Sequence, residues 1–337
     1  MNSMKLLYLS CHSILEYDEL RIFEELGIDY FSLGSYVDPR SPVDPIRPAL
    51  KHVPDDWAYH NTPDRDSIPK EFFDKFDVIV IMHKPEWIEN NWENMKHKRV
   101  IWRTIGQSTP SIEQRLWKYR LAGLEVARYS LREANIPQNI GCDKLIRFYK
   151  DENEFKAWSG STDEVITFAQ DMMHRGEFCN YNAFTQIVQG FNAHVYGPKN
   201  EASGDLNGGF MTYDQMQQKM RDARVYIYTG TQPASYVLNF IESWMTGVPV
   251  IALGKTHAGS LSSTLGINAD IYEVQDFIIN ATNGFISDNI DEIREWVKFL
   301  LDNKQAAKRI GETGRQAAIK LFGKEVVKLE WKKFLNI

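Results

Sequence analysis

The stretch "PASYVLNFIESWMTGVPVIA", residues 233–252, joins a helix-like segment to a strand-like one. In its first half Glu242 stands among large apolar residues that suit a buried helix, and Gly247 and Pro249 end that helix before the apolar run 248–253. A buried carboxylate is costly unless hydrogen bonds or a counter-ion compensate it. We therefore expect Glu242 either to reach water or to meet a polar ligand.

The same alternation of strand and helix runs through the rest of the chain. Compact apolar runs that are typical of buried strands, with helical spacing between several of them, lie at residues 4–9, 76–82, 99–106, 164–169, 193–197, 224–230 and 248–253. A Pro- and Asp-rich stretch at residues 38–69 predicts a long surface loop. The pattern predicts an α/β protein with two doubly wound, Rossmann-like parallel-sheet domains.

The two strand–helix series set the expected domain boundaries. We predict an N-terminal domain over residues 1–155, a C-terminal domain over 156–318 and a helix over 319–337 that packs back on the N-terminal domain. Gly311, Gly314 and Gly323 predict that the last helical region is broken. Because ligands bind at the carboxyl ends of parallel strands, the cleft between the two domains is the expected site.

Composition narrows the class of protein. The 337 residues are 43% hydrophobic and 25% charged, which indicates a soluble globular protein. The net charge of −6 makes nucleic acid an improbable partner on bulk charge alone. Three distant cysteines offer no metal or disulfide pattern, and no signal peptide or membrane-spanning run is expected, so a cytoplasmic location fits best.

The segment around Glu242 also suggests how a nucleotide could be held. A strand that ends at Thr229 leads through a turn with Gly230 into the helix, and the backbone amides of Ser235, Tyr236 and Val237 are the expected phosphate donors at its start. Glu242 would then lie two turns on, roughly 8–10 Å along the helix axis. A carboxylate there could accept hydrogen bonds from the two hydroxyls of a ribose.

Several segments together resemble the GT-B retaining glycosyltransferases of the family-4 type. They are "YTGTQPASYVLNFIESWMTGVPVIA", "VITFAQDMMHRGEFCNYNAF", "AHVYGPK" and "NGFISDNIDEIREWVKFLLDN", and the resemblance covers roughly residues 164–320. It implies a GT-B fold whose two domains face across a cleft, a UDP- or GDP-linked sugar donor on the C-terminal domain, and transfer of a hexose with retention. It implies no cofactor and no tightly bound metal.

The resemblance also assigns residues of the donor site. Arg175 takes the position of a diphosphate-binding cation, which makes it a catalytic candidate, and the segment with Met211 and Thr212 takes the position that contacts the base. The sugar-contact motif is atypical, because Ala234 stands where the family has a Glu. Gln170 likewise replaces an Arg.

In the N-terminal half, His83 and Gln107 each follow a predicted strand and are the other catalytic candidates, with ordinary loop residues as the alternative. His12 is a weaker candidate of the same kind, and Arg103 lies inside a predicted strand and needs a partner. Asp64 and Asp66 have the spacing of a metal-binding DxD motif, but they lie in a Pro-bounded loop, so no metal site is predicted.

The acceptor stays open at this level. The main hypothesis is transfer to a hydroxyl of a glycan, lipid or small molecule. The alternatives are glycosylation of a modified nucleic-acid base, and a nucleotide-sugar-binding protein that has lost transfer, as Ala234 and Gln170 would allow. The basic aromatic run "RLWKYR" is compatible with peripheral membrane contact or with a plain surface helix, and the protein with a monomer or a homodimer.

Overall fold

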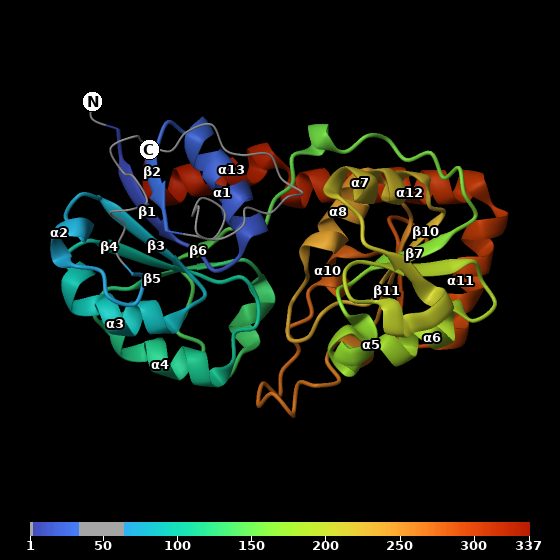
Figure 1. Cartoon of the computed structure of the whole chain (residues 1–337), viewed down its shortest axis with the longest axis horizontal. Helices are drawn as coiled ribbons and strands as arrows, with labels where there is room; N and C mark the ends of the chain where they lie inside the picture. The colour runs from blue at the N-terminus through green and yellow to red at the C-terminus, as the bar shows by residue number, and fades with distance from the viewer. Residues whose placement is uncertain (1–2, 34–63) are drawn as a thin grey trace. The chain divides into compact units, whose positions relative to one another are not determined.

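The computed structural model describes residues 3–33 and 64–337, and the chain divides into two compact units (Figure 1). Unit 1 comprises Met1–Phe148 and Val327–Ile337, and unit 2 comprises Tyr149–Val326. The divisions fall at 148/149 and 326/327, where the sequence predicted 155/156 and 318/319. Of the predicted loop at 38–69, only residues 64–69 lie within the described part.

Unit 1 contains a parallel six-stranded sheet with the order β2-β1-β3-β4-β5-β6. Its strands are β1 (Lys5–Leu9), β2 (Asp29–Ser32), β3 (Val78–Met82), β4 (Arg99–Arg103), β5 (Glu125–Arg128) and β6 (Lys144–Leu145). Its helices are α1 (Ser13–Glu25), α2 (Lys70–Phe73), α3 (Pro85–Met95), α4 (Pro110–Leu121) and most of α13 (Lys324–Leu335). All five residues of β3 are buried, as expected for an apolar strand covered by helices on both faces of a sheet (Figure 1).

Unit 2 contains a second parallel six-stranded sheet, with the order β12-β11-β10-β7-β8-β9. Its strands are β7 (Val165–Phe168), β8 (Ala193–Tyr196), β9 (Asn207–Gly209), β10 (Val225–Tyr228), β11 (Val250–Leu253) and β12 (Phe285–Ser287). Its helices are α5 (Met172–Arg175), α6 (Tyr181–Val188), α7 (Tyr213–Asp222), α8 (Leu238–Thr246), α9 (Lys255–Ala258), α10 (Val274–Phe277), α11 (Ile290–Asp302) and α12 (Lys304–Phe322).

In each sheet the strand order reverses at one point. The reversal lies between β1 and β3 in unit 1 and between β7 and β10 in unit 2. Loops that leave the two strands at such a point run in opposite directions and open a crevice at the carboxyl edge of the sheet, where α/β proteins bind ligands. A ligand is therefore expected to bind at the loops after β1 and β3 in unit 1, or at those after β7 and β10 in unit 2.

The last helical region is broken, as the sequence predicted, and the break falls at Gly323. Helix α12 runs unbroken through Gly311 and Gly314. A Cβ on Gly311 would lie 2.0 Å from the carbonyl oxygen of Gly247, so α12 needs this glycine to approach the end of α8. After the break, Trp331 of α13 packs against Phe23 of α1 inside unit 1, with ring centroids 5.1 Å apart.

Candidate functional site

In unit 2 the loops after β7 and β10 are fastened to each other at the carboxyl edge of the sheet. The amide of Gln232 donates to the carbonyl of Phe178 (2.9 Å), and the side chain of Asn180 donates to the carbonyl of Thr229 (2.8 Å). Gly230, with φ +74°, makes the turn between them, as its position in the sequence predicted. The loops after β7 and β10 are thus held together by hydrogen bonds at the point where the strand order reverses.

Gln232 extends this set of hydrogen bonds to the loop after β11. Its buried side-chain amide donates to the carbonyls of Glu177 and His257 and to the hydroxyl of Ser260, and its oxygen accepts from the amide of Leu261. These bonds build the wall of a pocket of about 450 Å³, a size within the usual range for small-molecule sites. The pocket is lined by residues 232–234 and by residues of the segment 255–272.

Two lining residues bear on the sugar end of the predicted site. Ala234, which stands where the family has a Glu, lines the pocket, so this position presents a methyl group there. Lys255, the first residue of α9, lines the same pocket and is exposed, and it makes no ion pair with another described residue. Sequence reasoning missed Lys255, although its place directly after a buried parallel strand was the signal that could have found it.

Arg175 lies beside the turn at the end of β10. It is the last residue of α5, and its guanidinium donates to the carbonyl of Gln170 (3.4 Å). Burial raises the pKa of the neighbouring Cys179 thiol, and the Arg175 charge and a hydrogen bond with Thr231 oppose that rise. Arg175 forms no ion pair within residues 3–33 and 64–337, so its charge is available to an anion at this edge.

The start of α8 differs from the prediction. The helix begins at Leu238, so Ser235, Tyr236 and Val237 form an extended segment before it. The amide of Val237 donates to the hydroxyl of Tyr228 (3.2 Å), and Tyr236 is buried against Phe322. Tertiary contacts hold this segment out of the helix. The first-turn amides, which have no acceptor within a helix, therefore belong to Leu238 and Asn239.

Glu242 is compensated by a counter-ion. The carboxylate oxygen Oε1 lies 2.9 Å from Nζ of Lys150, and the two side chains are 6% and 1% exposed. Lys150 stands at the beginning of unit 2, where its amide donates to the carbonyl of Phe322. From the sequence we expected Glu242 to reach water or a polar ligand. Lys150 was not predicted as its partner, because the two residues are far apart in the chain. The ion pair joins α8 to the first residues of unit 2.

The residues predicted to contact a base lie after β9. Thr212 caps α7, with its side chain and that of Gln215 bonded to each other's amides. Met211 is half-buried, and Phe210 beside it is 63% exposed. The structure therefore places this segment at the surface near the carboxyl end of β9, and its role in base contact stays a prediction.

In unit 1, His83 lies at the reversal point of the sheet. It follows β3 with φ +59°, a conformation that is uncommon for residues other than glycine. Burial and the charge of Lys84 lower the pKa of His83 to about 4, and its Nδ1 atom is buried with no hydrogen-bond partner in the described part of the chain. The ring is therefore neutral at physiological pH. His12, after β1, caps α1 by accepting from the amide of Leu15.

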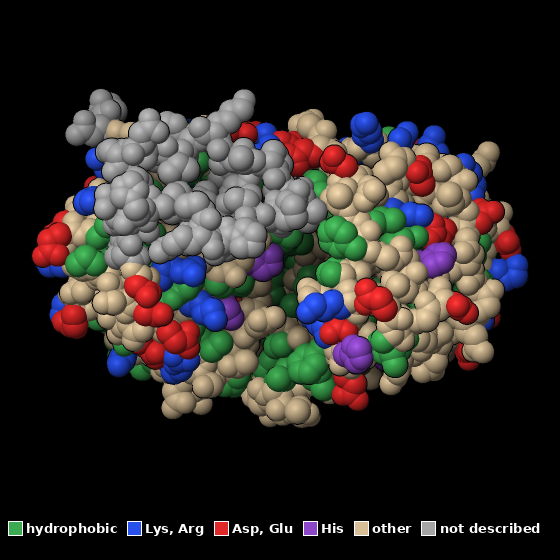
Figure 2. Space-filling view, in the orientation of Figure 1, with side chains coloured by type: hydrophobic (Ala, Val, Ile, Leu, Met, Phe, Trp, Pro, Cys, Tyr) green, Lys and Arg blue, Asp and Glu red, His purple; other side chains and the backbone are tan. Residues whose placement is uncertain are grey.

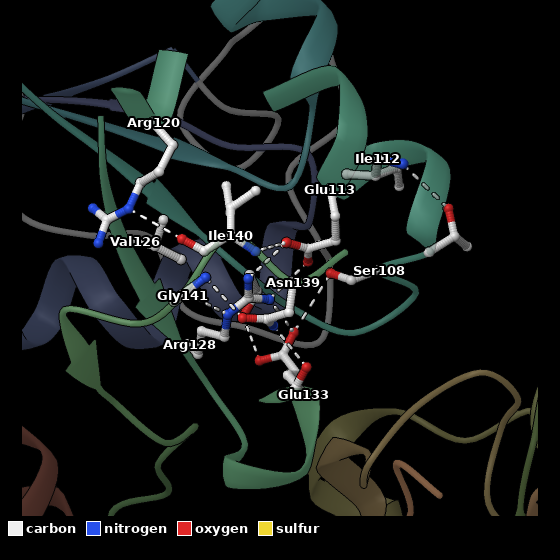
Figure 3. Close-up of polar contacts among 12 residues, drawn as sticks. Ser108, Ile112, Glu113, Arg120, Val126, Arg128, Glu133, Asn139, Ile140 and Gly141 are labelled. Carbon is white, nitrogen blue, oxygen red and sulfur yellow. Dashed lines mark hydrogen bonds and ion pairs between the residues drawn. The ribbon is translucent and has the colours of Figure 1, made fainter. Parts of the chain in front are cut away.

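Gln107 lies on the loop that follows β4. A buried network of charged side chains, drawn in Figure 3, bonds to this loop. The Glu133 carboxylate accepts from the hydroxyls of Thr104 (2.7 Å) and Ser108 (3.4 Å), which stand on either side of Gln107 in sequence. Arg128 contacts Glu133 at 3.7 Å and makes a bidentate pair with Glu113. Gln107 itself is exposed, so the network anchors an exposed amide at the carboxyl edge.

The remaining candidates have structural explanations in the contacts that they make. Arg103 is fully buried and pairs with Glu19 at 2.7 Å. Asp64 accepts from the amide of Asp66 in a turn, and no group of three potential metal ligands occurs among residues 3–33 and 64–337. In the described helices no segment has the length and apolar character needed to cross a membrane.

The basic aromatic run forms α4. Trp117 is 52% exposed, whereas Arg115 and Arg120 are paired with the carboxylates of Glu89 and Asp143. Most of the basic charge of this helix is therefore already compensated. Peripheral membrane contact stays a prediction.

Comparison with known proteins identifies the fold. No family model and no curated protein matches the chain. Sucrose-phosphate synthase from Thermosynechococcus elongatus is 14% identical with a TM-score of 0.70, over 99% of this chain and 98% of that one. Anabaena HepE in complex with UDP is 13% identical with a TM-score of 0.65, over 99% and 100%. An alpha-glucosyltransferase in complex with UDP and a 13-mer DNA containing a HMU base is 10% identical with a TM-score of 0.61, over 99% of both chains.

These similarities extend over whole chains. The two parallel sheets with flanking helices are the two Rossmann-like domains of the GT-B glycosyltransferase fold, as the sequence predicted.

Proposed function

We propose that the protein is a glycosyltransferase that moves a hexose from a UDP- or GDP-linked donor to an acceptor hydroxyl, with retention of configuration. The observation that carries the proposal is the joined pair of loops after β7 and β10, with Arg175 at one side and a pocket of about 450 Å³ at the other. The fold supports it, because solved structures of the same fold include glycosyltransferases in complex with UDP.

The diphosphate binds at the turn between β10 and α8 in this proposal. Arg175 supplies the charge, and the amides of Leu238 and Asn239 replace the donors that the sequence suggested. A guanidinium can bind a diphosphate with two parallel hydrogen bonds. As the bond to the sugar breaks, negative charge grows on the diphosphate, so donors already in place lower the barrier. This chemistry calls for no metal.

The nucleoside end of the donor uses α8 and the segment after β9. Glu242 accepts the ribose hydroxyls, and the ion pair with Lys150 holds its carboxylate in one position. A carboxylate offers about four acceptor positions, so pairing with a lysine is compatible with a second set of bonds. Gly230 makes the turn that brings backbone close to the phosphates, and Met211 and Thr212 contact the base.

The acceptor binds at the carboxyl edge of the sheet in unit 1. His83 is neutral there, so it can accept a hydrogen bond from the attacking hydroxyl. Gln107 orients the acceptor from its anchored loop. Both residues are proposed to act on the acceptor, whereas Arg175 acts on the leaving group.

Release of nucleoside diphosphate from a panel of nucleotide-sugars tests the proposal. We expect slow hydrolysis of one UDP- or GDP-sugar by the wild type and loss of this activity in Arg175→Ala. Arg309→Ala is the matched control, because Arg309 is exposed on α12 of the same unit. Arg175→Ala should weaken binding of UDP far more than binding of uridine. Binding of a donor without turnover would point instead to a binding protein without transfer, and no binding of any donor would contradict both.

A modified nucleic-acid base is the second candidate acceptor. The observation in its favour is the similarity to the alpha-glucosyltransferase whose structure contains DNA with a HMU base. The net charge of −6 weighs against it. Transfer of radiolabelled sugar to an oligonucleotide with a hydroxymethylated base, but not to the unmodified oligonucleotide, would establish this candidate.

A further inference from the structure

Two cations lie where β1 and β3 end in unit 1, one on the loop after β3 and one on the segment before α2, and neither makes an ion pair with a carboxylate of the described chain. β1 and β3 are neighbours in register, with Leu9 opposite Ile81, so Ser10 and His83 leave the sheet at its reversal point. Figure 2 shows Lys and Arg side chains next to His side chains on unit 1. Two cations belong to this place, Arg65 and Lys84, and neither was a candidate on sequence grounds.

Arg65 is held against the end of β1. Its NH1 atom donates to the carbonyl of Ser10 (2.8 Å), and its guanidinium lies over the ring of Trp87, 4.7 Å from the centroid. The backbone there is fixed as well, because the buried side chain of Asn91 donates to the carbonyl of Arg65 and accepts from the amide of Ile68. Arg65 is therefore positioned, and one hydrogen bond leaves other N–H groups of its planar fork for a ligand.

Lys84 directly follows His83 and precedes α3. Its side chain is exposed and forms no ion pair with any residue in 3–33 or 64–337. The carboxylates that could neutralise it are engaged elsewhere, because Glu86 and Glu89 of α3 both pair with Arg115 of α4. Lys84 at the start of α3 therefore makes no direct ion pair with a described residue and interacts with Glu86 at longer range.

The Cys11 thiol lies at the ends of β1 and β3, where its Sγ atom donates to the Met82 carbonyl (3.6 Å). Burial raises the pKa of the Cys11 thiol to about 11, and the charges of Lys84 and Arg65 are the main influences that oppose the rise. Asp64 and Asp66 flank Arg65 in sequence, yet neither makes an ion pair with it. The contacts agree with the influence of both charges on the thiol, because Cys11 lies between Ser10, which Arg65 contacts, and the Met82 carbonyl, two residues before Lys84.

We propose that Arg65 and Lys84 bind a phosphate group, and that the acceptor of the sugar carries this group. The first statement stands on unit 1 alone, and the second rests on the proposed function. Two cations favour a dianion, and the planar guanidinium suits the paired oxygens of a phosphate. The site lies beside the neutral His83, so a phosphate bound here would place the hydroxyl-bearing part of the acceptor at the carboxyl edge.

Calorimetric titration of phenyl phosphate into the full-length protein, saturated with UDP so that the donor site is filled, tests the proposal. We expect binding by the wild type and a loss of affinity of about tenfold in Lys84→Gln and in Arg65→Gln. Lys75→Gln is the matched control, because Lys75 is an exposed cation of the same unit that precedes β3, at the other edge of the sheet. It should bind phenyl phosphate as the wild type does.

A second titration uses dimethyl phosphate, which separates the two sources of such a group. Stronger binding of the monoester supports a small phosphorylated acceptor, and equal binding of the diester supports the phosphate backbone of a nucleic acid. Equal affinity for phenyl phosphate in Lys84→Gln and the wild type, or no binding by the UDP-saturated wild type, would overturn the site. Failure to bind UDP or any donor would instead remove the proposed function, while the titrations without UDP still decide whether the anion site exists.

Discussion

The ion pair between Lys150 and Glu242 gives the sharpest test of how unit 2 combines stability with ligand binding. Two unit charges 2.9 Å apart attract by about 6 kcal/mol at an effective dielectric constant of ~20. Desolvation of both groups offsets much of this attraction. Lys150→Met removes the counter-ion of a buried carboxylate, so we expect it to destabilise α8 by about 3–5 kcal/mol, and Glu242→Met should cost a similar amount by removing the carboxylate that pairs with the buried lysine.

The double variant Lys150→Met/Glu242→Met separates structure from function. Replacing both charges by apolar side chains of similar length should restore most of the stability, to within about 1–2 kcal/mol of the wild type. If Glu242 also accepts ribose hydroxyls, the double variant will still bind UDP more weakly, by about 1–3 kcal/mol. We therefore expect the double variant to keep a stable unit 2 but to bind UDP more weakly than the wild type.

Hydrogen exchange by mass spectrometry on the peptides of α8 measures the stability, because it reports local opening without assuming a single unfolding step for two units. Calorimetric titration with UDP measures the donor site in the same samples. UDP affinity equal to that of the wild type in a well-protected double variant would show that Glu242 only supports α8. Similar protection of α8 in all three variants and the wild type would refute the ion pair itself.

Three further outcomes follow from the contacts described. Gln232→Ala removes four hydrogen bonds from the wall of the pocket and should weaken donor binding at least tenfold with little change in exchange at β10, measured by titration and hydrogen exchange. Gly311→Ala places a Cβ 2.0 Å from the Gly247 carbonyl and should lower the melting temperature by several degrees, whereas Ala306→Gly on the same helix should lower it less. Burial lowers the pKa of His83 from 6.5 to about 4, so between these pH values the unfolded chain binds more protons than the folded one. The stability of unit 1, measured by urea titration, should therefore fall as the pH falls from about 6.5 to 4, and His83→Asn should flatten this dependence.

The sequence was sufficient for the features that local chemistry decides. Apolar runs such as residues 78–82 became buried strands, Thr212 capped α7, and Gly247 ended α8 in the left-handed conformation. These features depend on side-chain burial, on a cap and on φ, all of which are written into neighbouring residues. The parallel arrangement of the strands was predicted from the same alternation, because parallel strands need crossover connections, usually helices.

The missed features depend on residues that are distant in sequence. Tyr236 packs against Phe277 and Phe322, and the carbonyl of Ser235 accepts from the amide of Glu273, so the segment before α8 stays extended although its residues could form a helix. The absence of a side chain at Gly311 lets α12 approach Gly247 at the end of α8. Helix propensity describes neither contact, since both partners come from other elements.

The distribution of charge explains why the candidate site could be predicted only in part. Glu242, the buried acid found from the sequence, is paired with Lys150, a cation that the sequence could not assign. Glu113 and Glu133, which the sequence did not single out, are paired with Arg128. Such pairs hold α8 and the loop of Gln107 in place. The charges left for ligands are cations at the carboxyl edges that make no ion pair with described residues: Arg65, Lys84, Arg175 and Lys255. Both edges would therefore attract anions, which is the electrostatic pattern that a diphosphate donor and a phosphorylated acceptor require.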